Sequence, residues 1–90
     1  MRSRYCAYVL ELEDYLLATW HPATAPKAIE FANTQWLKLT IQRTETTGAS
    51  GLVEFIAEYK ESGRFRRLHE VSHFLLVHDR WFYERGDIQA

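Results

Sequence analysis

Four side chains of this 90-residue sequence have the chemical types that acid–base catalysis needs: Asp14, His21, His69 and Glu70. Glu70 follows Leu68 by two residues and precedes Phe74 by four, so the period of two is expected to place it on the same side of a strand as these apolar residues. An apolar environment raises the proton affinity of a carboxylate and suits it to proton transfer. One hypothesis is therefore a small enzyme in which Asp14 or Glu70 is the base and His21 or Tyr83 is its partner.

Simpler interpretations of these residues are preferred, and no catalytic residue is assigned. Glu70 could form an ion pair with Arg2 or Arg4, and structural ion pairs also perturb carboxylates. His21 precedes Pro22, where a helix must end, and an imidazole can hydrogen-bond to the free carbonyls at a helix C-terminus.

Metal or cofactor binding is not expected. His69 and His73 lie on one face of a strand, but four residues at about 3.3 Å each separate them by roughly 13 Å. Ligands of one zinc ion must lie within about 2 Å of it. Cys6 is the only cysteine and is interpreted as a packing residue. The sequence contains no glycine-rich phosphate loop and no Ser-His-Asp order.

The composition indicates one globular domain over residues 1–90. Hydrophobic residues make up 47% of the chain, and 11 basic against 12 acidic residues give a net charge of −1. These values exclude disorder and argue against nucleic-acid binding by charge alone. No apolar run approaches the roughly 20 residues of a membrane span, and a lone cysteine fits a reducing cytoplasm. The basic cluster is interpreted as a solvated turn: Lys60, Arg64, Arg66 and Arg67.

The N-terminal third is predicted to be helical. Its apolar stripe follows steps of three and four through Tyr5, Val9, Leu12, Leu16 and Trp20. Arg4 and Asp14 fall off this stripe. The pattern fits one helix or two short ones, with Asp14 able to cap the second. A further short helix is predicted from Thr24 to about Ala32.

The remaining chain alternates with a period of two and predicts four strands, near 35–42, 53–60, 66–77 and 80–84. Leu37, Leu39 and Ile41 are expected to share one face of the first strand. The short connections predict an antiparallel meander, and helices followed by a sheet predict an α+β fold with the helices on one sheet face.

The opposite sheet face also carries apolar residues, although a solvated face should be polar. They are Ile56, Val71, Leu75 and Phe82. This pattern predicts a covered face, as in a homodimer or a contact with a separate domain. The alternative is a one-residue shift in the third strand, which would exchange its two faces.

Several stretches in order along the chain resemble the middle domain of the YchJ-like family: Met-Arg-Ser-Arg-Tyr at 1–5, Asp-Tyr-Leu-Leu-Ala-Thr-Trp-His-Pro at 14–22, Gln-Trp-Leu at 35–37, Leu-His-Glu at 68–70 and Arg-Trp at 80–81. The resemblance covers almost the whole chain. It implies a nuclear-transport-factor-2-like (cystatin-like) cone, in which N-terminal helices pack into the concave side of a curved four-stranded antiparallel sheet.

The chain departs from that family pattern in two places. Longer relatives carry a cysteine-rich, zinc-binding SEC-C segment before the Met-Arg-Ser-Arg-Tyr stretch, and this sequence does not include it. The chain is therefore expected to be either an excised domain or a natural short form, and zinc is not carried over. Ala25 follows Thr24 where the family often has arginine.

The resemblance implies no specific activity, and folds of this class host enzymes, ligand binders and dimerisation modules. We expect a non-enzymatic accessory domain whose concave pocket binds a small molecule or peptide. The residues expected at this pocket are Trp20, His21, Trp36, Glu70 and Tyr83. The acid–base enzyme described above is the alternative.

Overall fold

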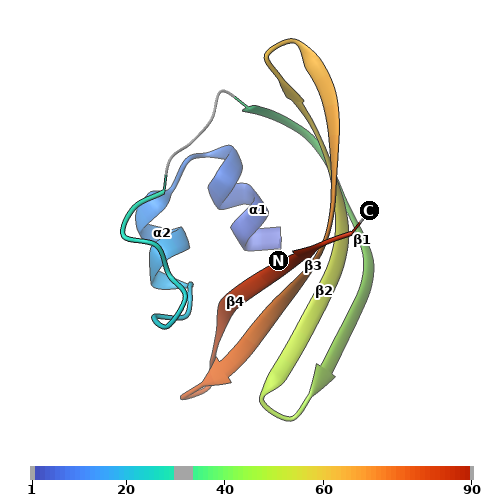
Figure 1. Ribbon diagram of the computed structural model, residues 1–90. Helices are drawn as coiled ribbons and strands as arrows, with labels where there is room; N and C mark the ends of the chain where they lie inside the picture. Colours follow the sequence, from blue (N-terminus) through green and yellow to red (C-terminus); the bar gives the residue numbers. More distant parts are fainter. Residues whose placement is uncertain (1, 30–33, 90) are drawn as a thin grey trace.

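A computed structural model describes residues 2–29 and 34–89, apart from the side chain of Arg2. Two short helices precede a four-stranded antiparallel sheet with the strand order β1-β2-β3-β4. Both helices lie on the same side of the sheet (Figure 1). The fold is therefore α+β, as the sequence predicts. The elements are α1 (Arg2–Val9), α2 (Glu13–Ala18), β1 (Thr34–Thr47), β2 (Ser50–Glu61), β3 (Arg64–Val77) and β4 (Arg80–Ile88).

The N-terminal helical segment is divided into two helices by a turn at Leu10 and Glu11. Glu11 has a positive φ of 54°, a left-handed conformation that cannot continue an α-helix. Asp14 does not cap α2. Leu12 occupies the N-cap position without a side-chain hydrogen bond, and Asp14 lies exposed in the first turn. Its carboxylate is favourable there because the helix dipole is positive at the N-terminus.

Each hairpin turn contains residues in the left-handed conformation that tight connections between strands require. Gly48 has a φ of 58° in the first turn, and Ser62 and Gly63 have φ values of 50° and 79° in the second. His78 and Asp79 form the third turn with φ values of 50° and 65°. The short connections predicted between the strands are confirmed, but β4 continues to Ile88, beyond its predicted end.

The predicted facing of β1 is wrong at Leu37. A register shift between Trp36 and Lys38 interrupts the alternation, so that Trp36 pairs with Tyr59 and Lys38 with Glu58. Leu37 is the extra residue at this bulge and is 46% exposed.

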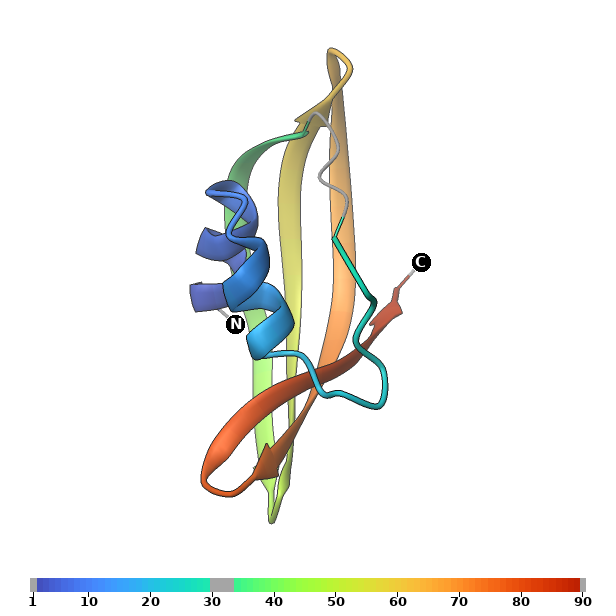
Figure 2. The ribbon, with the colours of Figure 1, turned by 90° about the vertical axis from the view of Figure 1, so that its left-hand side faces the viewer.

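The helix predicted from Thr24 to about Ala32 is not formed over its described part, because residues 24–29 have no helical conformation. Residues 30–33 lie outside the described residues. The segment is instead held to its neighbours: the Thr24 hydroxyl donates to the Glu84 carbonyl at 2.6 Å, and the Ile29 amide donates to the Glu13 carboxylate at 3.0 Å. In Figure 2 this segment runs beside β4. Tertiary hydrogen bonds thus replace the helical ones.

The core lies between the helices and the sheet face that they cover, which we call the inner face. Its buried apolar side chains are Ala7 and Leu16 from the helices and Phe55 and Ala57 from β2. Phe55 pairs with Glu70 of β3, and alternation therefore places Leu68, Glu70, Ser72 and Phe74 on this same inner face. The inner face is thus mainly apolar but receives a carboxylate and a buried hydroxyl.

Candidate functional site

A cavity of about 240 Å³ lies between α1 and the inner face of the sheet. Side chains from α1 and all four strands line it, so only the folded chain assembles it. One part, which we call the apolar wall, consists of Tyr5, Trp36, Phe55, Ala57 and Leu68. The other part, which we call the polar end, consists of Arg4, Tyr8, Glu70, Ser72 and Tyr83.

Trp36 holds the aromatic side of the apolar wall together. Its ring lies edge-on to Tyr5 at a centroid distance of 5.8 Å and tilted against Tyr59 at 5.2 Å. Tyr8 contacts the same indole at 6.3 Å. Aromatic pairs at these distances add about 0.5–1.5 kcal/mol beyond the area that they bury. The bulge beside Trp36 leaves the indole on the inner face while Leu37 faces outward.

Arg4 is the most buried charged side chain of the described residues, with only 4% of its surface exposed. Its Nη1 donates to the Leu16 carbonyl at 3.2 Å and to the Thr19 hydroxyl at 2.6 Å. The Tyr8 hydroxyl also hydrogen-bonds to the guanidinium, while Nη2 is buried without a hydrogen-bond partner among the described residues. Burial lowers the pKa of Arg4, although arginine stays protonated in proteins.

Two aromatic rings stack on this guanidinium. Its Cζ lies 4.5 Å from the ring centroid of Tyr83 and 5.3 Å from that of Trp20. Trp20 and Tyr83 meet edge to face at 4.9 Å, and Trp20 Nε1 is a second buried donor without a partner among the described residues. The rings attract the cation, but no ion pair within 4.0 Å joins Arg4 to a carboxylate in the described part of the chain.

Glu70 is held at the other side of the polar end. Its Oε2 accepts a hydrogen bond of 2.5 Å from the hydroxyl of Ser72, which is fully buried. Ser72 pairs across the sheet with Gly86, and the Glu70 carboxyl group lies over this glycine. A β-carbon at position 86 would be within 3.0 Å of the carboxyl atoms, so the absence of a side chain there makes room for Glu70.

The two tyrosines of the polar end resist ionisation. Burial raises the pKa of the Tyr83 hydroxyl, and the negative charge of Glu70 raises it further. Burial also raises the pKa of Tyr8, although the neighbouring Arg4 partly opposes this effect. Both hydroxyls are therefore protonated at neutral pH and available as hydrogen-bond donors.

The structure brings three of the expected pocket residues together at one cavity: Trp36, Glu70 and Tyr83. Trp20 lies directly behind this cavity, against Tyr83 and Arg4. The ion pair suggested between Glu70 and Arg4 is not formed, since no contact within 4.0 Å joins them. The side chain of Arg2, the other suggested partner, lies outside the described residues.

His21 and Asp14 are placed away from Glu70. The His21 amide donates to the Tyr83 carbonyl at 2.6 Å, which ties residue 21 to the edge of β4. Its Nδ1 accepts a hydrogen bond from the Ala23 amide at 3.1 Å, so this ring nitrogen caps a turn rather than the end of α2. Asp14 is exposed on α2. Neither residue lines the cavity among the residues described for it.

Sequence reasoning missed Arg4 and Tyr8, which both belong to the polar end. The sequence pattern places Arg4 off the apolar stripe and suggests it only as an ion-pair partner of Glu70, yet Arg4 is buried. The spacing of four residues between Arg4 and Tyr8 places them on one helix face and was the available signal. This spacing is a weak signal for a buried site, because arginine is rarely fully buried unless it is paired.

A second hollow of about 250 Å³ lies between the helices and the lower part of the sheet. Arg4 lines both hollows. The second one is rich in hydroxyl groups, including those of Thr19, Thr44 and Thr46, and Trp81 also lines it. Among its described lining residues only Arg4 and Glu45 carry charge. The cavity with the polar end also has two charged lining residues, Arg4 and Glu70, and we treat it as the candidate site because it brings Trp36, Glu70 and Tyr83 together.

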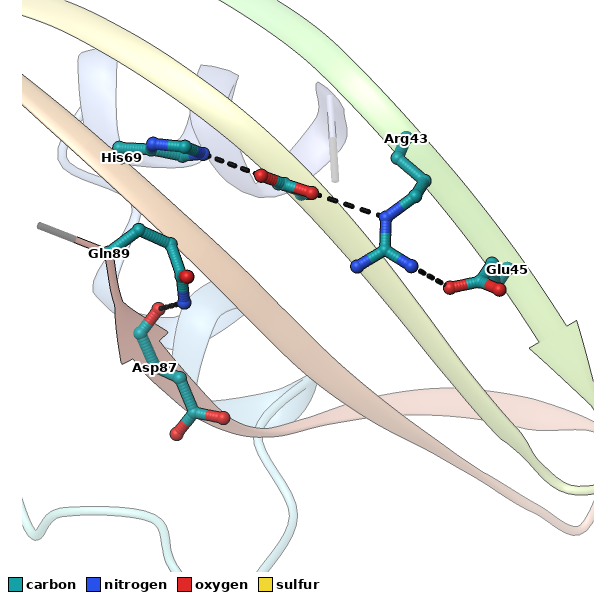
Figure 3. A network of polar contacts seen from close by, with 6 residues as sticks. Arg43, Glu45, His69, Asp87 and Gln89 are labelled. Carbon is teal, nitrogen blue, oxygen red and sulfur yellow. Dashed lines mark hydrogen bonds and ion pairs between the residues drawn. The ribbon is translucent and has the colours of Figure 1, made fainter.

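The opposite face of the sheet, which we call the outer face, carries two polar clusters. Figure 3 shows one around Arg43, Glu45 and His69, and Asp87 of the other. His69 Nε2 lies 2.7 Å from Glu54 Oε2, and Arg43 Nε donates to the other oxygen of Glu54 at 3.2 Å. His73 pairs with Asp87 in the same way at 2.9 Å. The hydrogen bond from His69, followed by that from Arg43, lowers the pKa of Glu54. His69, one of the acid–base candidates, therefore acts on this outer face and not at the cavity.

The apolar residues expected on the outer face lie beside these clusters. Val71 is 9% exposed and stands between His69 and His73 along β3. The other three are half-buried: Ile56, Leu75 and Phe82.

Within the described ranges, no three His, Cys, Asp or Glu side chains lie close enough together to hold a metal ion. No helix there has the length and apolar character needed to cross a membrane.

Comparison with known proteins shows the family of this chain. The family model described as YchJ, middle NTF2-like domain, matches residues 1–86. A UPF0225 protein of Chromobacterium violaceum is 47% identical over 93 residues, covering 96% of this chain and 69% of that protein. A UPF0225 protein of Polaromonas naphthalenivorans is 49% identical and covers 97% of this chain. The chain spans 65% of the length of that relative.

A solved structure also matches. The solution structure of a SEC-C motif containing protein from Rhodopseudomonas palustris superimposes with a TM-score of 0.89 at 30% sequence identity. The match covers all of this chain and 76% of that one. The family model, the sequence relatives and this structure agree over nearly the full length, and the chain belongs to the YchJ-like UPF0225 family through its middle NTF2-like domain.

Proposed function

We propose that this domain is a non-enzymatic binding module that holds a small, largely apolar molecule in the cavity between α1 and the sheet. The observation that carries the proposal is the division of the cavity into an apolar wall and a polar end with a buried guanidinium. Ligand sites commonly combine an apolar lining with a few polar groups that orient the ligand. We equate this cavity with the concave pocket that the family resemblance implies.

The size of the cavity argues for a small ligand. Its volume of about 240 Å³ is below the range of roughly 300–1,000 Å³ that is typical of sites for drug-sized molecules. A folded peptide segment would require a longer groove, whereas one compact side chain or ring suits this space. Contacts with the rings of Tyr5, Trp36 and Phe55 would supply most of the affinity.

The test is a titration of the ¹⁵N-labelled domain with a library of small aromatic and aliphatic compounds, followed by NMR shift changes. We expect shift changes to gather at residues around Trp36 and Glu70. In Leu68→Trp the larger side chain fills the cavity, and binding should be lost. Leu37→Trp is the matched control, because Leu37 is exposed at the bulge of β1. Equal binding by both variants would place the ligand elsewhere and refute the proposal.

A second candidate is proton transfer with Glu70 as the base, and the observation in its favour is the carboxylate placed beside two protonated tyrosine hydroxyls. Asp14 and His21 have no part in this version, because neither lines the cavity. The distinguishing measurement is incorporation of solvent deuterium into carbon-bound positions of a cavity ligand. Catalysis predicts incorporation by the wild-type chain and its loss in Glu70→Gln, whereas a binding module predicts none in either.

Association through the outer face is proposed in addition, with a second copy of this chain as the partner. Ile56, Leu75 and Phe82 lie on the face that the helices leave uncovered, and each remains partly exposed. Native mass spectrometry of the purified domain tests this directly. A dimer that becomes a monomer in Phe82→Glu supports association through this face, and a monomeric wild-type chain refutes it.

A further inference from the structure

Two opposite charges share the polar end of the cavity without neutralising each other. Arg4 enters from α1 and Glu70 from β3, and both line the same space. No contact within 4.0 Å pairs either of them with an opposite charge in the described part of the chain. Arg4 is buried and Glu70 is half-buried, and a charge removed from water without a partner is costly. An occupant that supplies the missing charges would therefore be stabilised.

Both groups also keep unused hydrogen-bonding capacity. A guanidinium has five N–H donors, and Nη2 of Arg4 has no partner among the described residues. Trp20, stacked on the same guanidinium, has a second donor at Nε1 without a partner among the described residues, but Trp20 lies behind the cavity and does not line it. A carboxylate accepts about four hydrogen bonds, and the one described for Glu70 comes from Ser72 to Oε2. The arrangement thus requires an acceptor near Arg4 and a donor near Glu70.

These two requirements restrict the chemistry of the occupant. A simple carboxylic acid would satisfy Arg4 but would bring a second negative charge toward Glu70. A simple amine would satisfy Glu70 but would meet the positive charge of Arg4. A zwitterion with both groups on one carbon satisfies both residues at once, and its third substituent is left to face the apolar wall.

From this complementarity we propose that the occupant is a free α-amino acid with a large apolar side chain, its carboxylate bound by Arg4 and its ammonium group by Glu70. The proposal rests on the binding function proposed above and deepens it by naming the ligand class. The side chain of the ligand packs against Tyr5, Trp36 and Phe55. A residue within a peptide lacks both charges, so the site discriminates against peptides.

Three probes that share one ring test the assignment: L-phenylalanine, 3-phenylpropionate and 2-phenylethylamine. Their dissociation constants are measured by NMR titration of the ¹⁵N-labelled domain at neutral pH. We expect phenylalanine to bind at least about tenfold more tightly than either truncated probe, because each truncation leaves either the buried Arg4 or the half-buried Glu70 unpaired. All three place the same ring against the apolar wall, so ring contacts cancel in the comparison.

Glu70→Gln tests the ammonium contact with little change in shape. This variant is expected to bind phenylalanine about tenfold more weakly, while its affinity for 3-phenylpropionate stays the same or increases because the repelling charge is gone. Glu58→Gln is the matched control, since Glu58 is exposed on the same sheet and should change neither affinity. A denaturation curve for each variant separates loss of binding from loss of folding.

Every other pattern of results overturns the assignment. Equal affinity for 3-phenylpropionate and phenylalanine would make the ligand a carboxylic acid, and equal affinity for 2-phenylethylamine would make it an amine. None of the three probes binding, while other library compounds bind the wild type and not Leu68→Trp, would refute the amino-acid assignment and leave the binding function standing. If no compound binds at the cavity at all, both proposals fail.

Discussion

The contact between Gly86 and Glu70 gives the sharpest stability prediction, through the substitution Gly86→Ala. A β-carbon at this position would lie 2.7 Å from Oε1 of Glu70 and within 3.0 Å of the other carboxyl atoms. The backbone φ of Gly86 is not positive, so alanine itself is not strained there. The whole cost should therefore arise from displacing the Glu70 side chain.

The size of the effect follows from what Glu70 leaves behind. Glu70 is flexible and can rotate away from the new methyl group, but the fully buried Ser72 hydroxyl then loses its acceptor. An unsatisfied buried hydroxyl costs about 1–3 kcal/mol. We expect Gly86→Ala to lower the free energy of unfolding by about this amount, and not by the larger cost of a clash with backbone.

A double-mutant cycle with Glu70→Ala checks this explanation. Without the carboxyl group the new methyl group meets no obstacle, and Gly86→Ala should be neutral or stabilising by about 0.4–1 kcal/mol because alanine restricts the unfolded chain. The four proteins are compared by urea denaturation followed through tryptophan fluorescence. If Gly86→Ala costs the same in both backgrounds, the carboxyl group is not the obstacle and the account of Glu70 positioning is refuted.

Three further predictions concern stability and pH. Leu16→Ala should cost about 2–5 kcal/mol in urea denaturation because Leu16 is completely buried, whereas Leu10→Ala at an exposed turn should change stability by less than about 0.5 kcal/mol. Hydrogen bonds with His69 and Arg43 lower the pKa of Glu54, and hydrogen bonds with Arg85 and His73 lower that of Asp87. Both carboxylates therefore stabilise the fold above their unfolded-state pKa values, and this stabilisation is lost as the pH falls through their folded-state pKa values. In the double variant Glu54→Gln with Asp87→Asn, the loss of thermal stability below about pH 4.5 should be shallower than in the wild type. The pKa of Tyr83 is raised by burial, so its contribution to stability is present below about pH 10 and is lost above it. Ultraviolet titration of the folded chain should show tyrosines that resist ionisation, and Tyr83→Phe should remove the most resistant of them while Tyr8 still ionises at raised pH.

Local sequence patterns are enough to predict several elements of this structure. Alternation along 66–77 placed Glu70 and Ser72 on the same face as Leu68 and Phe74, because side chains on a strand point to opposite faces in turn. The turn at Ser62 and Gly63 followed from the positive φ that glycine readily adopts. Helices before a meander of strands were sufficient to predict an α+β fold, and the family resemblance agreed with it.

Tertiary structure alone decided which distant groups meet. Arg4 lies off the apolar stripe, yet it is buried because the rings of Trp20 and Tyr83 and the carbonyl of Leu16 surround it, and these come from three separate segments. Residues 24–29 contain a helix-start pattern, but long-range hydrogen bonds to Glu84 and Glu13 outweigh a propensity of a few tenths of a kcal/mol per residue. The polar end of the cavity belongs to this second class: burial and unpaired charge depend on the packing of the whole chain, and no local pattern records them.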